Sequence, residues 1–127
     1  MTTHAPVAAT LGTVSKDLQA LHRQLLRFQA DQVGFDGTPL QLFDRATKDT
    51  GFAWLKPLRD AIVALDDRRA EKEPLSAAET KAYGDRFRDL IDAETGPFRD
   101  KLNIAFQSDP EVIIAVSTAR KSLAELS

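Results

Sequence analysis

The sequence predicts an all-α protein, a helical bundle of four principal helices with one or two short helices. Three observations lead to this fold class. Apolar residues recur at steps of three and four along most of the chain, which places them on one face of a helix. Residues that favour the starts and ends of helices stand between these stretches. No alternation of apolar and polar residues persists long enough to build a sheet.

The first and longest helix is expected from about Leu11 to Val33. Gly34 is placed to end it, because glycine readily adopts the left-handed conformation of a helix C-cap. The heptad spacing of its stripe also suits a coiled-coil seam, so the stripe would serve a subunit interface as well as a core. The stripe consists of Leu11, Val14, Leu18, Leu21, Leu25 and Phe28.

Residues 1–10 are expected to form a flexible tail and residues 11–127 a single helical-bundle domain. A length of 127 residues fits one domain with one core.

A short helix is expected from Pro39 to Lys48. Thr38 is its predicted N-cap, and Pro39 occupies the first turn, where its missing N–H costs nothing. Three apolar side chains are expected to anchor this helix to the core, namely Leu40, Leu42 and Phe43.

The third helical segment runs from about Phe52 to Glu71, after the break at Asp49-Thr50-Gly51. Pro57 interrupts it, and a proline inside a helix removes a hydrogen bond and bends the helix. The sequence therefore predicts either a kink near Ala53 or a helix that starts at Lys56.

The fourth helix is expected from Ala77 to Ala93. Ser76 and Glu79 form a capping box at its start, in which each side chain satisfies a free backbone N–H. Gly84 lies inside this helix and costs about 1 kcal/mol relative to alanine, which suggests a close approach between helices there.

Two more helical stretches complete the chain. One follows Gly96-Pro97, with its apolar stripe at Phe98, Leu102, Ala105 and Phe106. The last is expected from Pro110 to Leu126, with the run Ser108-Asp109-Pro110-Glu111 capping its start and Pro110 in its first turn.

Composition and charge exclude several classes of function. The chain has no cysteine, which excludes disulfides, thiolate metal sites, iron–sulfur clusters and cysteine nucleophiles. Its net charge is −2, and acids and bases are intermixed, whereas nucleic-acid-binding proteins concentrate basic residues. We find no targeting segment in residues 1–10 and no apolar stretch of about 20 residues, so we expect a cytoplasmic protein without nucleic-acid or membrane partners.

The candidate residues for an interface or pocket are His22, Trp54, Pro57, Phe87 and Phe98. The only other histidine is His4, so His22 lacks the partners that a metal site or a hydrolase triad needs, and a structural role is favoured. Trp54 is expected to be a core residue, although a helix bent at Pro57 would open a groove beside it. In a pocket, Trp54, Phe87 and Phe98 would supply apolar walls, with His22 or Tyr83 as the polar group.

The carboxylates of Asp85, Asp89 and Asp92 share one helical face, with Glu94 close by. Facing carboxylates can hold metal ions in helical bundles, but the Glu-x-x-His pairs of di-iron sites are absent and arginines are interspersed. The pattern favours a solvated face of mixed charge, so we expect no metal, no cofactor and no catalytic residues.

The segment FAWLKPL at residues 52–58, with the run IVALD at residues 62–66, resembles a segment found in a group of small bacterial proteins of uncharacterised function. The run from Leu18 to Leu26 is similar to the opening helix of that group. The resemblance covers about half of the chain. It implies a bacterial origin and a helical fold, and it implies no activity.

No motif in the sequence identifies an activity. The leading hypothesis is a non-enzymatic helical bundle that acts through contacts with an unknown protein partner or with itself, as a homodimer. The alternative is a bundle that binds a small molecule or a metal. An enzyme that uses Asp85 and Asp89 is disfavoured, because the spacing supplies no shared cleft for an acid and a base.

Overall fold

The computed structural model describes residues 4–126, and these form six α-helices, one 3-10 helix and no strand. The prediction of an all-α protein is therefore confirmed. The expected helix count is not matched in detail, because α5, with 12 residues, is hardly shorter than α3, with 14. The elements in chain order are α1 (His4–Gln32), α2 (Pro39–Lys48), η1 (Thr50–Leu55), α3 (Lys56–Arg69), α4 (Ala77–Ile91), α5 (Pro97–Ser108) and α6 (Pro110–Ala124).

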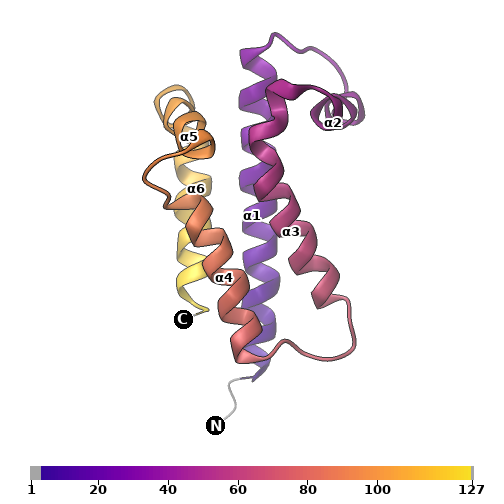
Figure 1. Cartoon of the computed structure of the whole chain (residues 1–127), viewed down its shortest axis with the longest axis vertical. Coiled ribbons are helices and arrows are strands. Elements are labelled where there is room, and N and C mark those ends of the chain that lie inside the picture. The colour runs from indigo at the N-terminus through magenta and orange to yellow at the C-terminus, as the bar shows by residue number, and fades with distance from the viewer. Residues whose placement is uncertain (1–3, 127) are drawn as a thin grey trace.

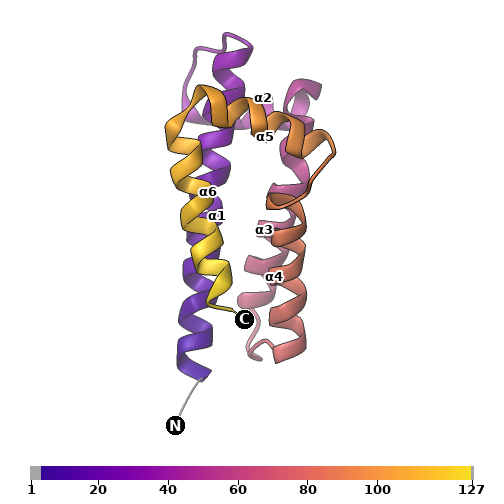
Figure 2. The same ribbon diagram turned by 90° about the vertical axis from the view of Figure 1, so that its left-hand side faces the viewer.

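Four helices, α1, α3, α4 and α6, run along the long axis of the molecule (Figure 1). The chain ascends in α1, descends in α3, ascends in α4 and descends in α6, so consecutive long helices are antiparallel. The shorter helices α2 and α5 both lie at the end of the bundle that is opposite the two termini (Figure 2). We call this the α2/α5 end.

The apolar stripe of α1 forms the centre of the core. Its six residues, Leu11 to Phe28, are at most 4% exposed, and Leu18, Leu21 and Leu25 are fully buried. The most extensive helix–helix packing is between α1 and α6, which supplies Val112, Val116, Ala119 and Leu123. The stripe is thus buried within a single chain, which leaves it no surface to offer to a second copy.

The helix α1 begins earlier than expected and ends where the sequence predicts. Residues 4–10 are helical rather than a tail, because the segment is rich in alanine and Pro6 falls in the first turn, where proline is tolerated. Residues 1–3 of the expected tail lie outside the described residues.

At the C-terminal end of α1, Gly34 has a φ of 67°. The N–H groups of Gly34 and Phe35 donate to the carbonyls of Asp31 and Ala30, which is a Schellman cap, as the position of Gly34 predicts.

The start of α2 agrees with the prediction, but its packing does not. Thr38 and Gln41 form a capping box, and Pro39 is in the first turn. However, Leu40 is 78% exposed and Phe43 57% exposed, so they do not anchor the helix; Leu42 and Ala46 pack against the core instead. The physical reason is the helical period, since Leu42 and Ala46 are one turn apart on the face that meets the core, whereas Leu40 lies nearly opposite Leu42 and Phe43 lies at the edge of that face.

The Pro57 alternatives are resolved in favour of a helix start. Asp49 caps η1 by accepting a hydrogen bond of 2.8 Å from the N–H of Gly51. The tight 3-10 turn carries Trp54, and α3 begins at Lys56 with Pro57 in its first turn, where no hydrogen bond is lost.

Gly84 faces a side chain rather than the backbone of a neighbouring helix. A Cβ atom there would lie 3.1 Å from the guanidinium of Arg88. This guanidinium donates to the carbonyl of Leu123 in α6 at 2.9 Å. The expectation of a close helix approach is thus corrected: glycine makes room for an arginine that joins α4 to α6.

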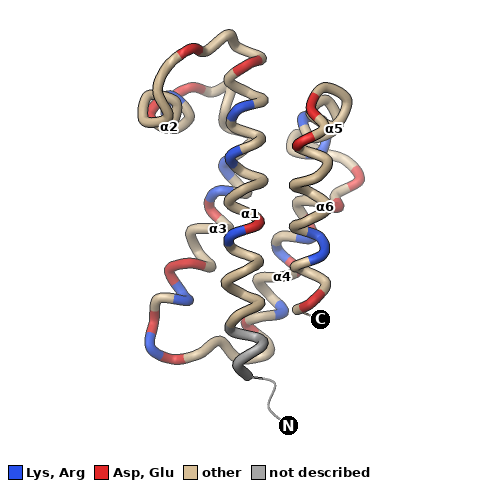
Figure 3. Tube along the Cα trace, turned by 180° about the vertical axis from the view of Figure 1, so that it is seen from behind, with Lys and Arg blue, Asp and Glu red and all other residues tan. Residues whose placement is uncertain are grey.

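The remaining predicted caps are confirmed. Ser76 and Glu79 form the capping box of α4, and Asp109 accepts from the N–H of Glu111 at the start of α6. Every α-helix carries both signs of charge, as Figure 3 illustrates. Within residues 4–126, no helix has both the length and the apolar character needed to cross a membrane.

We predict unequal effects for two identical substitutions. Leu21→Ala should lower the free energy of unfolding by about 2–5 kcal/mol, because it leaves a cavity in the core. Leu40→Ala removes the same atoms from an exposed side chain and should change it by less than about 0.5 kcal/mol. Urea unfolding followed by far-ultraviolet circular dichroism measures both. Equal losses would mean that the face of Leu40 is buried in solution.

Candidate functional site

Two hollows in the described part of the chain are large enough to consider as sites. One, of about 200 Å³, lies between α1, α2, η1 and the start of α3. The other, of about 920 Å³, is a more open depression at the opposite end, around the connection from α3 to α4.

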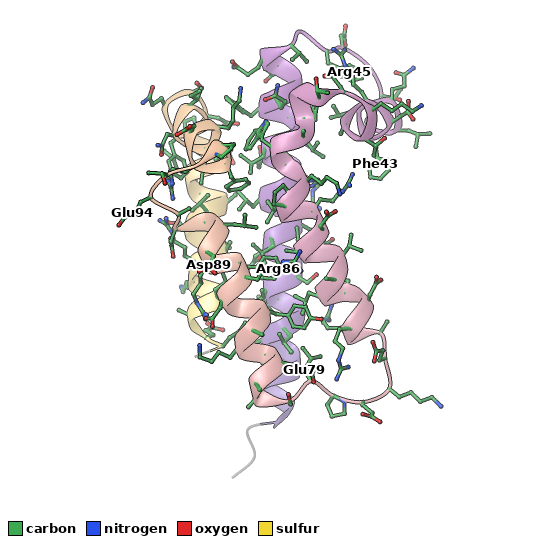
Figure 4. The ribbon with its side chains drawn as sticks, in the orientation of Figure 1. Phe43, Arg45, Glu79, Arg86, Asp89 and Glu94 are labelled. Carbon is green, nitrogen blue, oxygen red and sulfur yellow. The ribbon has the colours of Figure 1, made fainter. Side chains whose placement is uncertain are left out.

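The charges at the larger hollow are committed to holding the chain together. The Arg68 side chain is 14% exposed, and its guanidinium donates to both carboxylate oxygens of Glu79 at 2.8 and 3.1 Å. It also donates to the carbonyls of Glu73 and Pro74 in the connection. Arg68 and the N–H of Ser76 together lower the pKa of Glu79 to about 2. These contacts form a clasp between α3 and the lower end of α4, where Figure 4 labels Glu79, so we regard this hollow as structural.

The smaller hollow, which we call the α2 hollow, has an apolar floor with polar groups at its edge. Leu26 of α1 and the buried Phe52 and Leu55 of η1 form the floor. The covering residues come from α2, namely Phe43, Ala46 and Thr47. In Figure 4, Phe43 and Arg45 extend from opposite sides of α2.

His22 of α1 lines the α2 hollow and is half-buried. Burial, followed by the positive charges of Arg59 and Arg23, lowers the pKa of His22 to about 4. The imidazole is therefore neutral at pH 7, with one nitrogen that donates and one that accepts. Among residues 9–126, whose side chains the structure describes, no group forms a hydrogen bond with its ring.

Basic side chains surround the α2 hollow. Lys48 of α2, Lys56 and Arg59 of α3 line it, together with Asp49. The Asp49 carboxylate is held by Arg45 at 3.0 Å and by the N–H of Gly51 at 2.8 Å, and these hydrogen bonds lower its pKa. Asp49 is thus engaged in capping η1 and in the ion pair with Arg45, and three basic side chains line the hollow beside it.

Of the five candidate residues from the sequence, His22 lines the α2 hollow and the other four do not. Trp54 is 9% exposed and packs against Phe98, with ring centroids 5.6 Å apart. Its indole N–H donates to the Oε1 of Gln29 at 3.0 Å. Trp54 is therefore a core residue, as expected from the sequence. Phe87 is also buried in the core, and Pro57 is exposed on the first turn of α3.

Sequence reasoning missed the residues that accompany His22, chiefly Arg59, Lys56 and Phe52. One signal was present, since Lys56 and Arg59 are three residues apart and share a helix face. Nothing in the sequence indicates that the turn at η1 brings this face next to His22.

Two of the four carboxylates that the sequence groups together, those of Asp85 and Asp92, are used in ion pairs. Asp85 contacts Lys81 at 2.6 Å and Arg88 at 2.9 Å, and Asp92 contacts Arg120 at 2.8 Å. Asp89 and Glu94 are exposed (Figure 4). Among the described residues, no group of three or more histidine or acidic side chains is placed to hold a metal ion.

No protein-family model matches this chain, and no curated protein and no solved structure shows significant similarity to it. The resemblance of residues 52–58 to bacterial proteins of uncharacterised function stays a prediction.

The clasp predicts a specific loss of stability in acid. The pKa of Glu79 is about 2 in the folded protein, below its ordinary value of 4.5. The stabilisation is therefore present above about pH 4.5 and is lost as the pH falls towards 2. We expect the melting temperature of the wild type to fall more steeply over this range than that of Glu79→Gln. Glu94→Gln, at an exposed carboxylate outside the clasp, should behave like the wild type; parallel curves for all three proteins would contradict the role of Glu79.

The environment of His22 predicts an unusual titration. In proton NMR spectra, its imidazole resonance should titrate with a midpoint near pH 4, because burial and Arg59 disfavour the imidazolium. The His22→Gln variant assigns the signal, and Arg59→Gln should raise the midpoint. Since the pKa is lower in the folded state, stability should decrease as the pH falls from about 6.5 to 4. A midpoint near 6.5 would mean that the α2 hollow is open to water.

Proposed function

We propose that this chain is a non-enzymatic helical-bundle protein that acts through protein–protein contacts made by its α2/α5 end. One observation carries this proposal. Among the described residues, the exposed large apolar side chains belong to elements of this end, on both sides of the bundle (Figure 1), and Val63 in α3 is the exception. The others are Val33, Leu40, Phe43, Ile104, Ile113 and Ile114.

Apolar side chains that are held out into water favour association, because burying them removes apolar surface from water. The helix α2 has no fully buried residue; Leu42 and Ala46 pack partly against the core, and Leu40 and Phe43 are left exposed. Its charges are paired within the helix and its cap, Lys48 with Asp44 and Arg45 with Asp49, each at 3.0 Å. This pairing favours a partner that is bound by apolar contact rather than by opposite charge.

The partner that we propose is a second copy of this chain. An apolar surface is complementary to itself, and most soluble oligomers are symmetric assemblies in which two copies use the same patch.

Sedimentation equilibrium over a range of concentrations tests this proposal. We expect the wild type to form a dimer with a dissociation constant of about micromolar order, roughly −8 kcal/mol. The double variant Leu40→Asp with Ile114→Asp should weaken the dimer at least tenfold, by about 1.4 kcal/mol or more, since it places charges in an apolar contact. Circular dichroism verifies that the variant is folded.

The matched control is Val63→Asp, which changes an apolar side chain of similar exposure, 51%, away from the α2/α5 end. It should leave the dissociation constant unchanged. A wild type that stays monomeric, or an equal effect of Val63→Asp, would show that the α2/α5 end is not a self-association surface.

A second candidate function, small-molecule binding, is favoured by a separate observation. The α2 hollow joins an apolar floor, a neutral imidazole and basic groups in one place. Apolar pockets with a few convergent polar groups are the usual form of small-molecule sites.

A further inference from the structure

We propose that the α2 hollow binds a small organic monocarboxylate, with the carboxylate at Arg59 and Lys56 and the apolar part on Leu26, Phe52 and Leu55. This inference rests on the second candidate function, small-molecule binding, and names the class of ligand. Phe43 of α2 belongs both to the α2 hollow and to the surface proposed for self-association, so the two proposals are tested by separate measurements.

The floor of the α2 hollow suits the apolar part of such a ligand. Phe52 and Leu55 are each 2% exposed, and Leu26 packs beside them against the core. The hollow has a volume of about 200 Å³. An apolar cavity of about 150 Å³ is large enough to hold benzene, so there is room for one aromatic ring or a short branched chain.

The charges around the α2 hollow favour one negative charge. Lys48, Lys56 and Arg59 line it, and the carboxylates that pair with them belong to Asp44 and Asp60. Lys56 holds Asp60 at 2.8 Å, whereas the nearest approach of Arg59 to the same carboxylate is 3.5 Å. Three cations thus share two carboxylates. Because Asp49 is already bound by Arg45, one positive charge remains unmatched, and a monoanion would balance it.

Arg59 is suited to hold the carboxylate. Its side chain is 32% exposed, so its charge is partly shielded from water, and its single long contact with Asp60 leaves N–H groups of the guanidinium available. A guanidinium can donate two parallel hydrogen bonds to one carboxylate. Lys56, one turn earlier on the same helix, adds a flexible second charge.

His22 of α1 adds a neutral donor to the hollow. Its ring has no hydrogen-bond partner among the side chains that the structure describes, residues 9–126, and burial, together with the positive charges of Arg59 and Arg23, keeps it uncharged at pH 7. A neutral imidazole can donate one N–H to a carboxylate without bringing a further charge. A bound anion would in turn stabilise the imidazolium, so binding should raise the pKa of His22.

The helix α2 offers a way in. It covers the α2 hollow with Phe43, Ala46 and Thr47 but buries no residue of its own. An element with few buried contacts opens locally at low cost in free energy. Displacement of α2 would therefore admit a ligand while the core around α1 stays intact.

The test uses the full chain and three probes: benzoate, its neutral isostere benzamide, and inorganic phosphate. Each is titrated at pH 7 into isotopically labelled protein, and the backbone amide shifts are followed by NMR. We expect saturable shifts with benzoate at residues that line the α2 hollow. Benzamide and phosphate should each bind at least tenfold more weakly, because one lacks the charge and the other lacks the apolar part.

Arg59→Gln should weaken benzoate binding about tenfold and leave benzamide binding unchanged. Lys56→Gln, at a side chain that is 62% exposed, should weaken it in the same direction by a smaller factor. The matched control is Arg86→Gln on the exposed face of α4, which should have no effect (Figure 4). The His22 resonance should move to a higher midpoint pH when benzoate is added.

Each alternative result identifies what is wrong. Equal binding of benzoate and benzamide would overturn the carboxylate class but keep a small-molecule site. Binding of phosphate as strong as that of benzoate would overturn the role of the apolar floor. If none of the three probes produces saturable shifts in the α2 hollow, both this inference and the second candidate function are wrong.

Discussion

The burial of one continuous apolar stripe on α1 is the constraint on which the rest of the structure depends. The stripe extends from Leu11 to Phe28, over most of the length of the bundle, and each of its residues is almost completely removed from water. A stripe of this length has to be covered along its whole length, and α6, α3 and η1 all pack against α1. The turns and caps between these elements reverse the chain at the helix ends, so that each following helix returns alongside α1.

Most helix boundaries followed from local chemistry that the sequence displays. The caps at Thr38, Ser76 and Asp109, and the glycine at position 34, act through backbone groups within a few residues, so they can be recognised without knowledge of the fold. The packing of α2 could not be recognised in this way. Its apolar residues fall on two faces, and periodicity cannot tell which face meets the core when both are apolar. Gly84 was misleading for a similar reason, since a missing side chain indicates that space is needed but not what fills it.

The candidate site was predictable only in part. His22 stood out because histidine is rare in this chain, but its neighbours at the α2 hollow come from α2, η1 and α3, up to 37 residues away in sequence at Arg59. The short 3-10 turn of η1 brings them together. That turn also buries Trp54, which is why the most distinctive residue of the sequence became part of the core and a less distinctive arginine faces the hollow. The rarity of histidine therefore pointed to one residue of the α2 hollow, His22, but not to the basic side chains that line the hollow with it.

The sparse attachment of α2 has a consequence for how this protein moves. The free energy of opening differs between parts of a fold, and a helix without buried residues lies at the low end of that range. Amide hydrogens of α2 should then exchange with solvent through local openings, while those of α1 exchange only when the whole bundle unfolds. A single chain would thus contain a rigid body, formed by the long helices, and a short segment whose position is adjustable. Such a segment can adapt its shape to whatever contacts it, and the bundle that carries it need not be disturbed.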